Sequence, residues 1–101
     1  MSVMKVNKSN FDQVKSSEKP VLLDFYADWC GPCRMVGPIV EQIANENPQY
    51  VVGKINVDEE PELANAFGIV SIPTLVVLKN GAVAKQVSGA MPKDAILDLL
   101  K

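Results

Sequence analysis

The sequence of 101 residues contains no histidine and only two cysteines, Cys30 and Cys33. Structural zinc is held by four nitrogen or sulfur ligands, so one chain offers too few of them for a zinc site. Two chains could still share zinc or an iron–sulfur cluster through four thiolates. Nothing else in the sequence points to a dimer, so we expect a monomer that binds no metal and no other cofactor.

A basic surface, an apolar leader and a long apolar run are also missing. Ten Lys and Arg residues stand against twelve Asp and Glu residues, which gives a formal net charge of −2, whereas binding to phosphate backbones usually requires a basic patch. No apolar run approaches the roughly 20 residues of a membrane span. Residues 1–7 lack the apolar core of a signal peptide. We therefore expect a cytoplasmic protein that binds neither nucleic acid nor membrane.

The chain shows no internal repeat and no Gly/Ser-rich linker, so we expect a single domain over residues 1–101. Hydrophobic patterning predicts five strands. They cover residues 3–6, 21–27, 50–57, 74–78 and 82–87. Asn80-Gly81 lies between the last two strands and is a strong signal for a hairpin turn, so this pair should be antiparallel.

Four helices are predicted between and after these strands. The first carries Phe11 and Val14 inward, with Ser9-Asn10 as its cap, and the third covers residues 59–67 with Asp58 as its cap. Two further helices are indicated by apolar residues at helical spacing. These residues are Val36, Ile39, Val40, Ile43 and Ala44 in the second helix and Ile96, Leu99 and Leu100 in the last. The order βαβαβαββα predicts an α/β fold with a mixed five-stranded sheet and helices on both faces.

The two cysteines are separated only by Gly31-Pro32, which suggests a reactive pair rather than a structural crosslink. Closing a ring of about four residues stabilises a fold by roughly 2 kcal/mol at best. Such a ring is a weak crosslink, but its two sulfurs stay within bonding reach in both redox states. The spacing therefore favours a redox-active dithiol.

The pair lies where the second strand ends and the long helix begins. This places Cys30 at the helix N-terminus and Cys33 one turn further on, on the same side. Free backbone N–H groups and the helix dipole stabilise a thiolate at such a position. We predict that Cys30 is the attacking thiolate and that Cys33 is the more buried, resolving thiol.

The sequence resembles the thioredoxin family over nearly its whole length. Trp29-Cys30-Gly31-Pro32-Cys33 matches the active-site motif of that family, and Asp24, Lys54, Ile72-Pro73-Thr74 and Gly81 fall where its pattern places them. The resemblance implies a thioredoxin fold and a protein-disulfide reductase that works by reversible dithiol–disulfide exchange. It also implies a thioredoxin reductase as the source of electrons. Possible clients are ribonucleotide reductase, peroxiredoxin and methionine sulfoxide reductase.

Asp24 lies within the apolar run of the second strand, where an ionised carboxylate is costly unless it is paired or neutralised. One interpretation is that the side chain points to an exposed edge of the sheet. The resemblance implies instead a buried carboxyl that accepts the proton of Cys33. Lys54, on the neighbouring strand, would then be its electrostatic partner, or else an ordinary surface lysine.

The resemblance also implies a substrate-binding surface around the sulfurs. There the Ile72-Pro73 bond is cis, although only about 5% of X–Pro bonds in folded proteins are, and the backbone of Ile72 pairs with an extended substrate. Trp29 would contact the substrate, while Gly31 and Pro32 would shape the turn and start the helix. An apolar ring of Val70, Ile72, Gly89 and Ala90 would surround the sulfurs, although each could equally serve packing.

Two rival functions remain at this point. In a binding module, the same fold would serve as a subunit or holdase and the thiols would be incidental. An oxidising or isomerising relative would work in an oxidising compartment. The missing signal peptide and the Gly31-Pro32 dipeptide argue against the second rival.

Overall fold

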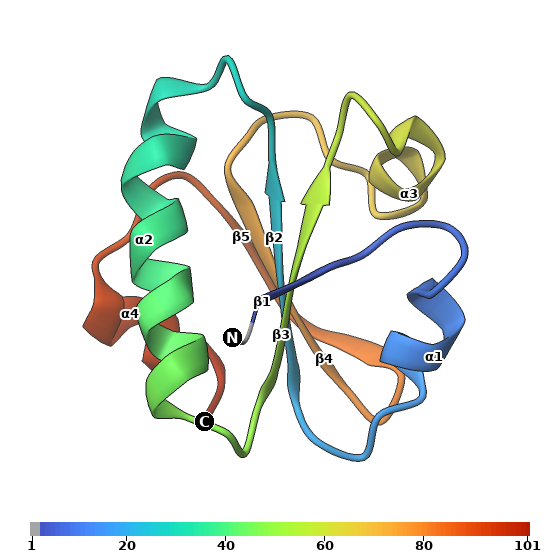
Figure 1. Ribbon diagram of the computed structural model, residues 1–101, viewed down its shortest axis with the longest axis vertical. Helices are drawn as coiled ribbons and strands as arrows, with labels where there is room; N and C mark the ends of the chain where they lie inside the picture. The colour runs from blue at the N-terminus through green and yellow to red at the C-terminus, as the bar shows by residue number, and fades with distance from the viewer. Residues whose placement is uncertain (1–2) are drawn as a thin grey trace.

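The computed structural model describes residues 3–101, so residues 1–2 of the predicted domain lie outside it. Five strands form one mixed sheet in the order β1-β3-β2-β4-β5 (Figure 1). The strands are β1 (Val3–Lys5), β2 (Val21–Tyr26), β3 (Val51–Asn56), β4 (Thr74–Lys79) and β5 (Ala82–Ser88). The first three are parallel to one another, while β4 runs antiparallel to both β2 and β5. The predicted mixed sheet is confirmed.

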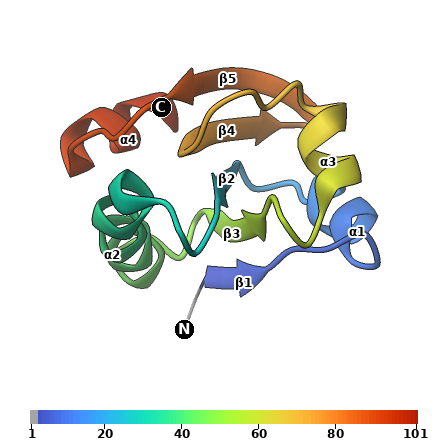
Figure 2. The same cartoon turned by 90° about the horizontal axis from the view of Figure 1, so that it is seen from above.

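Helices cover both faces of the sheet. Their bounds are α1 (Phe11–Lys15), α2 (Gly31–Glu46), α3 (Pro61–Ala66) and α4 (Lys93–Leu99). Seen from above, α2 and α4 lie on one side of the strands and α1 and α3 on the other (Figure 2). The predicted element order βαβαβαββα is therefore correct, and α2 runs on through Pro38.

Alternation along the central strand β2 divides the core into two parts. Leu22 packs with Val40 and Ile43 of α2, whereas Leu23 and Phe25 belong to the cluster on the opposite face. Side chains two residues apart on a strand share one face. Asp24 therefore lies on the same face as Leu22, beneath α2. Burial on both faces explains why β2 reads as a nearly unbroken apolar run.

The predicted hairpin between β4 and β5 is confirmed by its turn. Asn80 and Gly81 have φ angles of 55° and 79°. Positive φ at both central positions is the requirement that makes Asn-Gly so common in two-residue hairpins. The resulting pair places β5 at the edge of the sheet.

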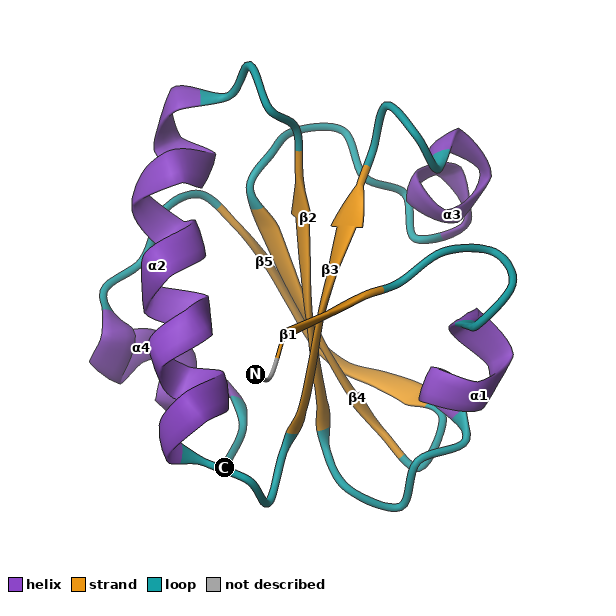
Figure 3. Cartoon of the chain, in the orientation of Figure 1, coloured by secondary structure: helices purple, strands orange, loops and turns teal. Residues whose placement is uncertain are grey.

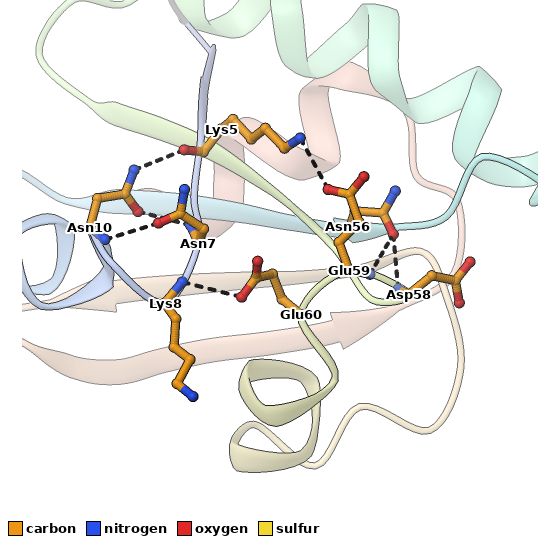
Figure 4. Close-up of polar contacts among 8 residues, drawn as sticks. All are labelled: Lys5, Asn7, Lys8, Asn10, Asn56, Asp58, Glu59 and Glu60. Atoms are coloured by element: carbon orange, nitrogen blue, oxygen red, sulfur yellow. Dashed lines mark hydrogen bonds and ion pairs between the residues drawn. The ribbon is translucent and has the colours of Figure 1, made fainter.

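The predicted helix caps were wrong in detail. Helix α3 begins at Pro61 with Glu60 at its N-cap, so Asp58 does not cap it. At α1, Asn10 occupies the N-cap position but its side chain does not cap the helix. It accepts the backbone N–H of Asn7 instead (Figure 4). In both places short polar side chains bond the loop before the helix, which competes with capping.

Gly53, in the middle of β3, is required by close packing rather than by its φ angle. A Cβ atom added there would lie 2.5 Å from Cγ2 of Val6, a buried side chain. By contrast, a Cβ atom on Gly37 in α2 would meet nothing within 4 Å.

We predict that Gly53→Ala lowers the free energy of unfolding by about 1–3 kcal/mol, because a stiff β-branched neighbour must move. The matched control Gly37→Ala should be neutral or raise it by about 0.5–1 kcal/mol, the usual gain in a helix interior. Urea unfolding of the oxidised proteins measures both. If the urea midpoint of Gly53→Ala equalled that of wild type, the packing of Val6 against Gly53 would be looser than the structure shows.

Candidate functional site

The two cysteines lie at the junction of β2 and α2, as predicted, and they are joined by a disulfide bond. Cys30 is the N-cap residue of α2, with extended backbone, and Pro32 lies in the first turn. The backbone N–H of Cys33 points to Sγ of Cys30 at an N···S distance of 3.2 Å. A free N–H group of the helix therefore faces the sulfur at the helix N-terminus.

The burial of the two cysteines differs from the prediction. Cys30 is 4% exposed and Cys33 is 5% exposed, so Cys33 is not the more buried residue. Both pack in a small cluster with Ala27, against which Val57 and Ile72 lie. The loop before β4 covers Cys30 from outside the strand-helix unit, which local sequence reasoning does not include. Sγ of Cys30 lies 3.8 Å from the carbonyl oxygen of Ile72.

Asp24 is buried, with 4% of its surface exposed, so the alternative of an exposed edge position is excluded. Its Oδ1 atom has no hydrogen-bond partner among residues 3–101. Burial raises the pKa of Asp24 from 3.8 to about 7, and the positive charge of Lys54 opposes this shift only in part. The carboxyl can therefore exchange a proton near neutral pH.

Asp24, Cys33 and Lys54 line one cavity of about 130 Å³. Lys54 lies opposite Asp24 in the register of β3 with β2, and its Nζ atom stands 5.8 Å from the ring centre of Tyr26. The wall facing the sheet is formed by α2, through Gly37, Val40 and Glu41. The structure therefore brings together the four residues predicted as catalytic, since Cys33 is bonded to Cys30.

The segment before β4 contains a cis peptide bond between Ile72 and Pro73, as the resemblance implies. Pro73 is buried, and its carbonyl oxygen accepts the backbone N–H of Gly89 at 2.8 Å. Gly89 has a φ of 101°, a conformation that favours glycine. This hydrogen bond joins the Ile72-Pro73 segment to Gly89, directly after the end of β5. The next residue, Ala90, is exposed.

An apolar groove of about 320 Å³ lies next to the sulfurs. It is lined by Trp29, Val57, Ala64, Ile69, Val70, Ser71 and Ile72. Trp29 is 67% exposed and Val70 is 95% exposed, although both are large apolar side chains. Of the residues predicted to form an apolar ring around the sulfurs, Val70 and Ile72 line this groove, whereas Gly89 and Ala90 do not. Gly31 and Pro32, predicted to shape the turn, are not part of the lining either.

Sequence reasoning missed several residues of this region. Nε1 of Trp29 donates to Oδ2 of Asp58 at 2.8 Å, so Asp58 holds the indole rather than capping α3. Oδ1 of Asn56 accepts the backbone N–H groups of Asp58 and Glu59, at 2.8 and 3.2 Å. An Asn at the end of a strand, followed by acidic residues, is a recognisable signal for such a turn.

Residues 3–101 hold neither a metal-binding cluster nor a membrane-spanning helix. The described part holds no group of three or more His, Cys, Asp and Glu side chains placed to bind a metal ion. Among the same residues, no helix has the length and apolar character needed to cross a bilayer.

The burial of Asp24 predicts a specific dependence of stability on pH. Between pH 4 and pH 7 the unfolded chain ionises this carboxyl while the folded chain keeps it protonated. The free energy of unfolding should therefore fall as the pH rises through this window, by on the order of 3 kcal/mol. Asp24→Asn removes this loss and should be more stable than wild type at pH 8.

Urea unfolding of the oxidised proteins at pH 4 to 8 tests this, because the disulfide keeps both thiols from titrating. Asp28→Asn changes a nearby exposed carboxylate and serves as the matched control. If the free energy of unfolding depended on pH in the same way in wild type and in Asp24→Asn, the raised pKa of Asp24 would be wrong.

Comparisons with known proteins agree with this site. The family model described as thioredoxin matches residues 2–101. A thioredoxin of Alicyclobacillus acidocaldarius is 47% identical over 94% of this chain and 91% of its own length. A bifunctional thioredoxin reductase/thioredoxin of Mycobacterium leprae is 50% identical over a match that covers 88% of this chain and 20% of that protein. The solved structure of a mutant thioredoxin from Halobacterium salinarum superposes with a TM-score of 0.91, at 43% identity over 98% of this chain and 88% of that one. The disulfide at the start of α2 and the sheet order agree with these matches. The chain therefore belongs to the thioredoxin family, and it is a thiol–disulfide oxidoreductase that acts as a protein-disulfide reductase.

Proposed function

We propose that Cys30 is the attacking thiolate of this reductase and that Cys33 is the resolving thiol. The observation that carries this assignment is the N–H of Cys33 directed at Sγ of Cys30, at the N-terminus of α2. In the reduced protein the same N–H, together with the helix dipole, stabilises a negative charge on Cys30. Cys33 lies inside the helix and faces the cavity of Asp24.

The reaction transfers two electrons to a client disulfide in two exchange steps. The Cys30 thiolate attacks one client sulfur, which forms a mixed disulfide and releases the other client sulfur as a thiolate. Cys33 then loses its proton and attacks Sγ of Cys30. The mixed disulfide breaks, the Cys30–Cys33 disulfide forms, and the second client sulfur leaves as a thiolate.

Asp24 is the base for the second step in this proposal. Its pKa of about 7 suits a group that accepts a proton from a thiol near neutral pH. Asp24 and Cys33 share the 130 Å³ cavity, so a proton can move between them directly or through water. Lys54, on the wall of the same cavity, favours the ionised carboxylate that forms when the proton leaves.

Clients dock, in this proposal, in the groove formed by Trp29, Val70 and Ile72. Exposed apolar side chains that adjoin a reactive disulfide favour binding of an extended apolar segment. The carbonyl oxygen of Ile72 accepts a hydrogen bond from the client backbone in this proposal, which is supported by its distance of 3.8 Å from Sγ of Cys30. Gly31 and Pro32 border Cys30 at the start of α2, and Gly89, directly after β5, donates its backbone N–H to the carbonyl oxygen of Pro73.

The oxidised protein needs an electron donor, and we propose a thioredoxin reductase for this role. The Mycobacterium leprae relative, whose name joins a thioredoxin reductase to a thioredoxin, supports it. No bound cofactor is required, because the electrons are stored in the dithiol. We propose a cytoplasmic location, where a reductase can keep the pair reduced, and as clients ribonucleotide reductase, peroxiredoxin or methionine sulfoxide reductase.

The assignment of the thiols predicts that Cys33→Ser accumulates a mixed disulfide through Cys30, because the resolving step is lost. Non-reducing mass spectrometry after mixing with insulin detects the adduct. Cys30→Ser is the matched control and should form far less adduct, since its remaining thiol faces the interior. The roles would be reversed if Cys30→Ser trapped insulin and Cys33→Ser did not.

The base role of Asp24 predicts that Asp24→Asn slows the two steps unequally. Resolution of the mixed disulfide should slow by about 100-fold, at the lower end of general acid–base catalysis, while attack by Cys30 changes little. Rapid quench with acid followed by thiol alkylation separates the two rates. Equal slowing of both steps would count against this role.

A further inference from the structure

We propose that Asn56 is a positioning residue for client docking: it fixes the turn after β3 so that Asp58 holds Trp29 in the wall of the groove. This inference rests on the docking groove assigned above. It adds a residue that makes no contact with the client, and it explains why a polar side chain is buried at the end of β3.

Asn56 is the last residue of β3 and is 5% exposed. Its side-chain oxygen accepts two successive backbone N–H groups, from Asp58 at 2.8 Å and from Glu59 at 3.2 Å (Figure 4). Its backbone oxygen accepts those of Glu59 and Glu60, at 3.2 and 2.9 Å. One buried residue therefore fixes three consecutive backbone groups of the turn.

The turn carries the hydrogen bond that orients the indole. Oδ2 of Asp58 accepts from Nε1 of Trp29 at 2.8 Å. Since Trp29 is 67% exposed, packing against the protein restrains its ring little. An exposed hydrogen bond between two mobile groups is worth little, because both must be ordered to form it. Asn56 removes this cost on the Asp58 side by ordering the backbone that carries the carboxylate.

Other contacts on the same turn are weaker candidates for this role. Lys5 pairs with Glu59 at 3.0 Å, but the two side chains are 61% and 51% exposed. The backbone N–H of Lys8 donates to Oε1 of Glu60 at 3.2 Å, also at the surface. Exposed ion pairs contribute little to order, so the buried amide of Asn56 is the strongest side-chain restraint among these. It acts beside backbone bonds such as that from the N–H of Val57 to the carbonyl oxygen of Tyr26, at 2.9 Å.

The test uses the fluorescence of Trp29, the only tryptophan of the chain. Asn56→Leu removes the acceptor while keeping the same branched skeleton, and Asp58→Ala removes the bond to the indole. In the oxidised protein, both should change the Trp29 emission and increase its quenching by acrylamide. Asn56→Asp keeps a side-chain acceptor and should retain the wild-type spectrum. A merely structural asparagine would change stability and leave the Trp29 spectrum as it is.

The same variants should affect docking without affecting chemistry. With pre-reduced protein in single turnover, Asn56→Leu should raise the half-saturating insulin concentration about fivefold, the effect of one ordinary hydrogen bond. The limiting rate should remain unchanged, as should the rate with the small disulfide 5,5′-dithiobis(2-nitrobenzoate). Glu59→Gln, a change on the same turn away from the indole, is the matched control and should behave as wild type.

Because Asn56 acts through Asp58 in this proposal, the double variant with Asn56→Leu and Asp58→Ala should match Asp58→Ala alone. Additive effects on half-saturation, or an unchanged Trp29 spectrum in Asn56→Leu, would overturn the proposal. If Asn56→Leu does not fold, Asn56→Ala takes its place, and failure of both to fold would make the role purely structural and refute it.

Val70→Ser separates this inference from the proposed function on which it rests. Val70 lines the groove from the loop before β4 and is not part of the turn after β3. If Val70→Ser leaves half-saturation unchanged, the docking groove itself is wrongly assigned. If Val70→Ser raises it while Asn56→Leu changes neither half-saturation nor fluorescence, the groove is correct and the positioning role is wrong.

Discussion

The contact between the N–H of Cys33 and Sγ of Cys30 depends on α2 starting immediately after the short turn, residues 27–30, that follows β2. A helix N-terminus leaves its first N–H groups without partners inside the helix. Here the buried sulfur of the N-cap residue takes the place that a serine or aspartate side chain usually fills. In the proposed mechanism, the N–H group of Cys33 that caps the helix through this sulfur also favours a thiolate on Cys30 in the reduced protein.

The buried carboxyl of Asp24 follows from the geometry of the same strand. Because side chains alternate along β2, the residue two positions after Leu22 has to face α2, and the start of α2 carries Cys33. Burial costs stability when the carboxyl ionises, yet it also brings the pKa to about 7. Burial of Asp24 therefore lowers the free energy of unfolding at neutral pH, and it also gives the protein a carboxyl that can bind and release a proton at that pH.

Local patterns predicted much of the fold and part of the site. Three features depend only on neighbours in sequence: the apolar run of β2, the Asn80-Gly81 turn and the spacing of the cysteines. Each of them gave a correct prediction, of a buried strand, a hairpin and a disulfide-forming pair. The similar burial of Cys30 and Cys33 was not predictable in this way, because Ile72 reaches them from a loop some 40 positions further along. Asp58 was misread for the same reason: its partner, Trp29, lies 29 positions away, whereas a helix start lies beside it.

The groove differs from the cysteine pair because no single segment encodes it. The loops after β2 and β3 and the loop before β4 meet at one end of the sheet (Figure 3), and each contributes part of the lining. Parallel β2 and β3 necessarily end at the same edge, which brings Asp58 to Trp29, and antiparallel β4 begins at that edge, which brings Ile72 to Cys30. The sheet topology therefore fixes which loops line the groove. In the docking that we propose, polar side chains such as Asn56 then set how rigidly each loop holds its part of the lining.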